Sequence, residues 1–180
     1  MKRMVLLVLA LLMLSGAGMA FSPDSSYVAL YIDTLRTGWR VDKGAGITPF
    51  EMWIWWLPGA SGIQAAEFRI VYPSSIIQTT LIASDSLSIS SGTPATAVMC
   101  AWIWCQHDWT WSHNQTLYLK DANPAEIMLA PSTVSGKLQI GGCGGVPLEP
   151  VRRWNNMCLN YDCGTAVHEK TWGAIKDLYR

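Results

Sequence analysis

Two cysteines, two histidines, an aspartate and four tryptophans lie within one short segment of the chain, CAWIWCQHDWTWSHNQ, between Cys100 and Gln115. Thiolate, imidazole and carboxylate groups are the side-chain ligands of zinc, so this segment is a candidate metal site. The tryptophans suggest two other interpretations, an aromatic surface that binds a ligand or the interior of a β-sandwich with a disulfide. The candidate metal ligands are Cys100, Cys105, His107, Asp108 and His113.

The spacing of these residues argues against zinc. Its ligand atoms must converge to about 2.0–2.3 Å from one centre. Cys100 and Cys105 are separated by an odd number of positions, so in one extended strand they point to opposite faces. His107 and His113 share a face, but extended chain separates them by roughly 20 Å. We therefore expect no metal ion and no other cofactor, although a tight bend over 106–108 would bring part of the set together.

The sequence contains no recognisable catalytic motif. It lacks G-x-S-x-G, a glycine-rich phosphate loop and H-E-x-x-H. His107 and Asp108 could form two members of a catalytic triad, but no motif places a nucleophile beside them. The glutamates are scattered singly, which does not suggest a paired acid and base. We therefore expect a protein that is not an enzyme and has no catalytic residues.

The first twenty residues predict export. Lys2 and Arg3 precede the apolar run MVLLVLALLML, and Gly18 and Ala20 precede a plausible cleavage site at Phe21. This pattern is typical of a secretory signal peptide, and its apolar run is short for a membrane-spanning helix. An uncleaved anchor is the alternative. We expect a protein that is secreted, periplasmic or on the cell surface, with no membrane span after cleavage.

Export favours disulfides, because the compartments outside the cytosol are oxidising. The chain has five cysteines, so one thiol is left over, and the sequence alone allows many pairings. Cys105 lies where a strand ends and Cys143 lies in a glycine-rich turn, so we predict a Cys105–Cys143 disulfide. Cys158 and Cys163 flank LNYD and are predicted to close a local turn. Cys100, within an apolar strand, is the predicted free thiol.

The composition favours a β-sandwich. Charged residues make up 14% of the chain, ten residues are tryptophan, and short apolar runs alternate with turn clusters rich in Gly, Ser, Thr and Pro. We predict a single antiparallel β-sandwich of eight to ten short strands over 21–163. The formal net charge is zero, and removing the two basic residues of the leader makes it −2, which provides no electrostatic basis for binding nucleic acid.

The tryptophans exceed what one buried face requires. In FEMWIWWL, Trp53 and Trp55 lie on the face opposite Trp56, and in AWIWC, Trp102 and Trp104 share a face. A sandwich strand normally buries one face only. Either a loop or a C-terminal helix covers the second face, or an aromatic strip is exposed and binds a surface protein or a glycan. The hypothetical ligand-binding residues are Trp53, Trp55, Trp102 and Trp104.

Strict alternation in WTWSHNQTLYLKD also makes a prediction for one histidine. It places His113 on the same face as Trp109 and Trp111, together with Leu117 and Leu119. A hydrogen-bonded structural histidine is the common outcome for such a position.

The last residues form a separate region, 164–180. GTAVHEK reads as a linker, and TWGAIKDLYR can form a short helix with Trp172, Ile175 and Leu178 or Tyr179 on one face. Two interpretations remain open. The segment either caps an apolar edge of the sandwich or is a recognition tag that stays disordered until it is bound.

Two stretches resemble known proteins. GIQAAEFRIVYP resembles a strand of cohesin and related carbohydrate-binding sandwich modules, in which Gly-Ile opens the strand, Phe68 and Tyr72 point inward and Pro73 ends it. The block from Cys105 to Pro150, together with TWGAIKDLYR, is similar to a group of short exported bacterial β-sandwich proteins without a characterised activity. The resemblances imply an exported sandwich that serves as a non-enzymatic binding or cell-envelope component. The alternative that they imply is a carbohydrate-binding or cohesin-like adhesion module with exposed tryptophans.

Overall fold

A computed structural model describes residues 26–42 and 47–163 of the chain. The predicted signal peptide and the predicted C-terminal amphipathic segment lie outside these residues. The described part is all-β, with fourteen strands, one short 3-10 turn (η1, Cys143–Gly145) and no α-helix. No helix in it is long and apolar enough to cross a membrane.

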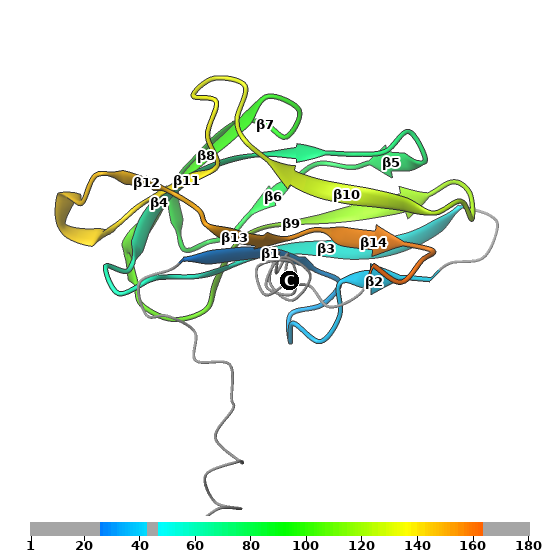
Figure 1. The fold of residues 1–180 in the computed structure, drawn as a ribbon, viewed down its shortest axis with the longest axis horizontal. Coiled ribbons are helices and arrows are strands. Elements are labelled where there is room, and N and C mark those ends of the chain that lie inside the picture. Colours follow the sequence, from blue (N-terminus) through cyan, green and yellow to red (C-terminus); the bar gives the residue numbers. More distant parts are fainter. Residues whose placement is uncertain (1–25, 43–46, 164–180) are drawn as a thin grey trace, which may run out of the picture.

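The strands form two sheets that pack face to face (Figure 1). In the first sheet the order is β13-β1-β3-β9-β5, and β6 also pairs with β9. Its strands are β1 (Tyr27–Tyr31), β3 (Thr48–Leu57), β5 (Ile76–Gln78), β6 (Ile82–Ala83), β9 (Thr110–Leu119) and β13 (Arg153–Asn155).

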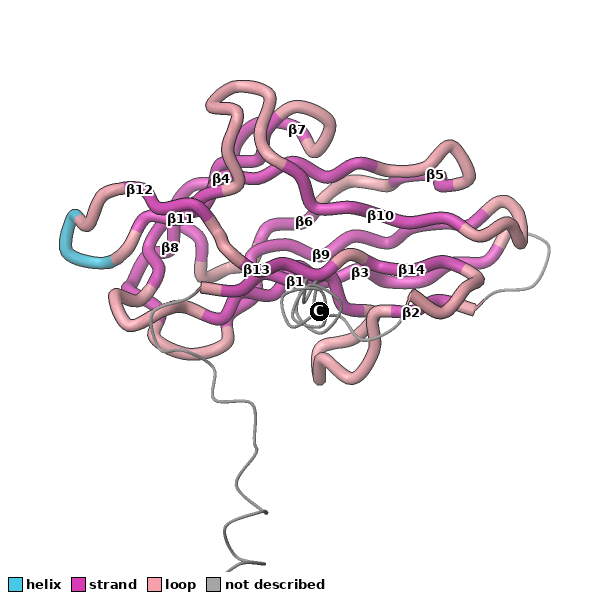
Figure 2. The backbone as a smooth tube through the Cα atoms, viewed as in Figure 1, coloured by secondary structure: helices cyan, strands magenta, loops and turns pink. Residues whose placement is uncertain are grey.

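The second sheet is centred on β4, which pairs with β8 along one edge and with β10 and β11 in succession along the other (Figure 2). β7 extends it beyond β8, β12 beyond β11, and β14 and β2 beyond β10. Its strands are β2 (Arg40–Val41), β4 (Ile63–Val71), β7 (Leu87–Thr93), β8 (Ala97–Gln106), β10 (Ala125–Ala130), β11 (Gln139–Gly141), β12 (Leu148–Pro150) and β14 (Met157–Leu159).

The predicted all-β sandwich is confirmed, with more strands than expected. The extra strands are very short, such as β2 and β6 with two residues each, and so few residues carry no periodic signal. Most pairs are antiparallel, but β1 runs parallel to β13, and β2 runs parallel to β14. The sheets are therefore mixed at their edges.

The core lies between the inward faces of the two sheets. Trp56 of β3 is fully buried, and its ring centroid lies 5.6 Å from that of Phe68 and 6.2 Å from that of Trp102, both in the second sheet. Its Nε1 donates a hydrogen bond of 2.9 Å to Oγ of Ser112. The alternation expected for FEMWIWWL holds, since every second residue from Phe50 to Trp56 is buried in this core.

A β-bulge in β9 reverses the faces to which the side chains before the bulge point. Ile54 pairs with His113 and the next residue of β3 pairs with Trp111, so Ser112 is the extra residue. Ser112 and His113 both point into the core, whereas Trp111 lies on the outer face. The prediction that His113 shares a face with Trp109 and Trp111 is therefore wrong, because strict alternation does not survive an inserted residue.

A larger bulge interrupts β8. Ala101 pairs with Ala65 and Gln106 pairs with Ile63, so five steps along β8 correspond to two along β4. The expected common face of Trp102 and Trp104 is lost at this point. Trp102 is buried at 1% exposure and packs in the core, while Trp104 is 76% exposed.

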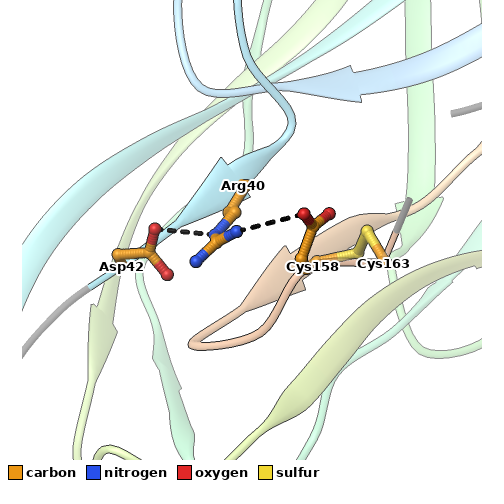
Figure 3. A network of polar contacts seen from close by, with 5 residues as sticks. Arg40, Asp42, Cys158 and Cys163 are labelled. Carbon is orange, nitrogen blue, oxygen red and sulfur yellow. Dashed lines mark ion pairs between the residues drawn. A yellow bond between two sulfur atoms is a disulfide. The ribbon is translucent and has the colours of Figure 1, made fainter. Parts of the chain in front are cut away.

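The C-terminal end of the described chain is fastened beside β2 (Figure 3). Cys158 of β14 is joined to Cys163 by a disulfide, and its backbone N–H donates to the carbonyl oxygen of Trp39. The Arg40 guanidinium pairs with Asp42 at 2.6 Å and with Asp162 at 3.6 Å. Because these ions are largely exposed, solvent screens their attraction and they add little to stability. Strand pairing and the disulfide dominate this closure.

Burial of His113 makes a prediction for the dependence of stability on pH. Its Nε2 lies 2.8 Å from Oγ of Ser90, its ring packs edge-on against Phe68, and burial lowers its pKa to about 4. An unfolded chain protonates this histidine near pH ~6.5, whereas the folded chain does not. Above pH ~6.5 the histidine is neutral in both states and costs no stability. The free energy of unfolding therefore falls by about 3 kcal/mol as the pH drops from ~6.5 towards 4. Urea unfolding of the wild type and of His113→Gln between pH 7.5 and 4.5 measures this loss.

The wild type should lose more stability than His113→Gln over this range, with an excess slope approaching ~1.4 kcal/mol per pH unit. The difference isolates His113 from other groups that titrate in the same range. Parallel curves for the two proteins would contradict the prediction.

Candidate functional site

The four tryptophans of the ligand-binding hypothesis do not lie on one surface. Trp53 and Trp55 project from the outer face of the first sheet, and Trp104 projects from the bulged end of β8 in the second sheet. Trp102 belongs to the core between them. Its place in a ligand-binding strip is therefore excluded, because no face of its indole reaches solvent.

An aromatic cluster covers the outer face of the first sheet. Trp53 and Trp111 pack edge to face at 5.0 Å between ring centroids, and Trp109 makes similar contacts with Tyr27 and Tyr31 at 5.9 and 6.2 Å. The strand register explains the gathering, because outward residues of β1, β3 and β9 are cross-strand neighbours. The aromatic cluster consists of Tyr27, Tyr31, Trp39, Trp53, Trp55, Trp109 and Trp111.

A loop closes the centre of this aromatic cluster. Arg36, between β1 and β2, places its guanidinium carbon 4.6 Å from the ring centroid of Trp55 and 5.0 Å from that of Trp109. The Asp33 carboxylate shapes the loop by accepting hydrogen bonds from the backbone N–H groups of Leu35 and Thr37. Each cation–π contact contributes roughly 0.5–2 kcal/mol. Of the alternatives open from the sequence, a covering loop is the one observed over Trp55, which is only 8% exposed.

Sequence reasoning missed Arg36. One arginine in the loop segment IDTLRTGW has no spacing that distinguishes it from a solvated surface residue. Its role depends on a backbone conformation with φ of 61°, which turns the side chain over the sheet. Only the folded loop reveals this contact.

The outer face of the second sheet carries a different surface, which we call the apolar stripe. Strand register places five residues in one row: Ile89, Ala101, Ala65, Gly141 and Leu148, from β7 across β8, β4 and β11 to β12. The two ends of the row are open, with Ile89 59% exposed and Leu148 57% exposed. The three central residues are small, so the middle of the face is flat.

Close packing at Gly141 and two exposed neighbouring residues complete the apolar stripe. A Cβ atom at Gly141 would lie 3.3 Å from a methyl group of Leu148 and 3.4 Å from Cβ of Ala65, so glycine lets the row pack closely. Met99 and Ile103 of β8 add exposed apolar surface beside the row. Contiguous apolar surface of this kind often marks an interaction site. Sequence reasoning missed the stripe because its members come from five strands, and register across strands is not visible in local patterns.

The pairing of the cysteines is the next feature of the candidate site. Cys105 is joined to Cys143 with their Cα atoms 5.6 Å apart, and Cys158 is joined to Cys163. These are the pairs expected from the sequence. Cys100 carries a free thiol and is buried in the core. Burial raises the pKa of the Cys100 thiol to about 12, so it remains protonated and unreactive.

Only part of the metal-ligand set considered from the sequence comes together. Nε2 of His107 lies 3.0 Å from Sγ of Cys105, and Cys143 completes a group whose ligand atoms all lie within 4.8 Å of one another. Cys100 and His113 are buried elsewhere in the core, and Asp108 accepts a hydrogen bond from the N–H of Trp109. The expected tight bend is present, and Cys143, which lies outside the segment from Cys100 to Gln115, completes the group.

Gly62 makes the Cys105–Cys143 contact possible. It lies in the turn before β4 with φ of +70°, and a Cβ atom there would lie 2.7 Å from Sγ of Cys143 and 2.8 Å from Sγ of Cys105. The adjacent Ser61 accepts a hydrogen bond from the Cys143 N–H. Three chain segments therefore meet around the disulfide with no room for a larger residue.

Comparison with known proteins identifies the architecture. Neither a protein-family model nor a curated protein matches the chain. A cohesin module of a family 33 glycoside hydrolase from Clostridium perfringens has 13% identity and a TM-score of 0.52, covering 71% of this chain and 90% of that one. The chain has a cohesin-like fold.

Two further solved structures support the same fold. The seventh ScaB type I cohesin from Pseudobacteroides cellulosolvens has 10% identity and a TM-score of 0.53, covering 78% of this chain and 94% of that one. A type I cohesin–dockerin complex from Clostridium thermocellum has 10% identity and a TM-score of 0.51, covering 75% and 92%. At these identities the likeness concerns the fold. It agrees with the resemblance of GIQAAEFRIVYP to a cohesin strand.

Steric crowding at Gly62 predicts a large cost for any side chain at this position. Gly62→Ala combines a left-handed backbone with a clash against both sulfurs and should lower the free energy of unfolding by more than about 3 kcal/mol. Gly136→Ala is the matched control, because Gly136 has φ of +72° but nothing within 4 Å of its added Cβ. It should cost only about 1–2 kcal/mol. Denaturant unfolding of both variants measures the difference, and equal costs would refute the crowding.

Thiol counting tests the cysteine assignment. Iodoacetamide should leave the native, unreduced protein unmodified, because the Cys100 thiol is buried and protonated. Unfolding in urea without reductant should allow a single alkylation, at Cys100, while the other four cysteines remain in disulfides. Intact-mass measurement followed by non-reducing peptide mapping gives the result. Modification of another cysteine, or of Cys100 in the native state, would show that the assignment is incorrect.

Proposed function

We propose that this chain is an exported, non-enzymatic module that binds a partner protein through the apolar stripe of its second sheet. The proposal includes a cleaved leader over 1–20, a single binding domain over 21–163, and a location in the cell envelope or outside the cell. The cohesin-like fold and the two disulfides fit a binding or adhesion module. The carrying observation is the row from Ile89 to Leu148, open at both ends and flat between them.

The chemistry of the apolar stripe favours a protein as the partner. Apolar contact area with little charge is the pattern of an interface core, where aliphatic residues pack and water is excluded. Sugars need hydrogen-bonding groups beside an aromatic platform, and the row itself has neither. Solved structures with this fold include a complex with a dockerin, which is a protein partner. A partner with a complementary apolar face is the simplest match.

One observation supports carbohydrate as a second candidate. Trp104 is 76% exposed at the end of β8, so its indole ring is available for stacking against a sugar. Trp53 and Trp55 support this alternative less, since they pack within the aromatic cluster and Arg36 covers the face of Trp55. Trp104 alone provides one stacking platform for one sugar ring. We therefore expect such binding to be weak and to involve the end of a glycan chain.

Matched isoleucine variants test the protein-binding proposal. Ile89→Asp places a carboxylate in the apolar stripe, whereas Ile82→Asp places one on the first sheet at a side chain of similar exposure, 55% against 59%. Both positions are at the surface, so both variants should fold. Binding is measured by surface plasmon resonance against purified type I dockerins and the separated exported proteins of the organism that produces the chain. For any partner found, Ile89→Asp should weaken binding at least tenfold, which corresponds to about 1.4 kcal/mol.

The other outcomes discriminate between the candidates. Equal affinities for wild type, Ile82→Asp and Ile89→Asp would contradict the role of the apolar stripe. Binding to polysaccharides that is lost in Trp104→Ala but retained in Ile89→Asp would favour the carbohydrate-binding alternative instead.

A further inference from the structure

Among residues 26–42 and 47–163, the Cys105–Cys143 disulfide is the one with an imidazole beside it. His107 is exposed, and its Nε2 lies 3.0 Å from Sγ of Cys105. Both cysteines are partly exposed, whereas Cys158 of the second disulfide is buried. Among the described residues, the group of side chains close enough to share a metal ion is Cys105, His107 and Cys143. Reagents and ions can reach this corner of the sandwich.

We propose that Cys105, Cys143 and His107 form a zinc-binding site when the disulfide between the two cysteines is reduced. Two thiolates and one imidazole are a common zinc ligand set, and the exposed position leaves the fourth coordination place to water. The two thiolate charges balance the charge of the ion. The proposal is independent of protein binding at the apolar stripe, because it concerns other residues and another chemistry.

Reduction by a low-molecular-weight thiol opens the site in two exchange steps. A thiolate of the reductant attacks Sγ of Cys143, the sulfur–sulfur bond breaks, and the Cys105 thiolate leaves. The imidazole of His107, with Nε2 3.0 Å from Sγ of Cys105, lies beside the departing thiolate. A second thiolate of the reductant attacks the reductant sulfur of the mixed disulfide and releases Cys143. Two electrons pass to the protein, and the reductant is oxidised to its own disulfide.

Metal binding then needs only a small rearrangement. With bonds of about 2.3 Å to a tetrahedral ion, the two sulfurs must separate to roughly 3.7 Å. Cys143 can supply this movement from its C-terminal side, because an added Cβ at Gly144 or Gly145 would meet nothing within 4 Å, whereas Gly142 before it packs closely against Ser61 and Val146. Cys105 is the second-last residue of β8 and His107 follows directly after the strand, so both remain beside the ion. Binding one Zn²⁺ releases the protons of the two thiols.

Cobalt substitution tests the site directly. The purified protein is reduced with dithiothreitol, desalted without oxygen and titrated with Co²⁺. We expect one equivalent to bind with sulfur-to-cobalt charge-transfer absorption and the intense d–d bands of a tetrahedral centre, and Zn²⁺ should displace it. The oxidised protein should show none of these bands, since its sulfurs are bonded to each other.

Variants separate this site from other sources of cobalt binding. His107→Ala should weaken Co²⁺ at least tenfold and Cys143→Ser should reduce the charge-transfer absorption, whereas Asp108→Ala, beside the site, should change neither. The double variant Cys158→Ala/Cys163→Ala should keep the full signal, which excludes the second cysteine pair. Circular dichroism of the reduced protein checks that the fold persists. Loss of the fold on reduction, absence of the bands, or bands unchanged in His107→Ala would each overturn the proposal.

Discussion

Contact between the two sheets at Trp56 is the interaction on which the rest of the sandwich depends. This indole packs against Phe68 and Trp102 of the opposite sheet, and its N–H donates to Ser112 within the buried core. Burying three large rings contributes roughly 2–3 kcal/mol each. The hydrogen bond matters because a buried N–H without a partner costs about 1–3 kcal/mol. The extra residue in β9 supplies that partner, so the bulge is part of the core.

The bulges in β9 and β8 also determine which side chains lie on the outer faces of the two sheets. In β9 the bulge turns Trp111 outward to join the aromatic cluster, and in β8 a longer bulge separates buried Trp102 from exposed Trp104. The two outer faces consequently differ. Arg36 closes the centre of the aromatic cluster, whereas the apolar stripe is open at both ends. A sandwich with one covered face and one open face fits a binding module.

The bulged end of β8 also brings the stripe and the disulfide corner into one region of the second sheet. Residues after Ala101 leave the regular register, and this allows Cys105 to meet Cys143 and His107 to fold back beside the sulfur. Gly62 leaves room for the two sulfurs, and Gly144 and Gly145 after Cys143 have open space around them. The disulfide and the neighbouring imidazole of His107 therefore result from one interruption of strand pairing in β8, at the point where two loops approach this strand.

Local patterns in the sequence determined the all-β class, the inward face of FEMWIWWL and the burial of Cys100, and they indicated the cysteine partners among many possible pairings. Each of these follows from alternation over a few residues or from the character of a turn, which neighbouring residues dictate. The tertiary structure decided which tryptophans are exposed, where His113 points, what Arg36 covers, and that Ile89 and Leu148 end one row. The physical reason is that a single extra residue reverses every later side chain in a strand, and that register joins residues far apart in the chain. Neither effect leaves a mark on the local pattern of hydrophobicity.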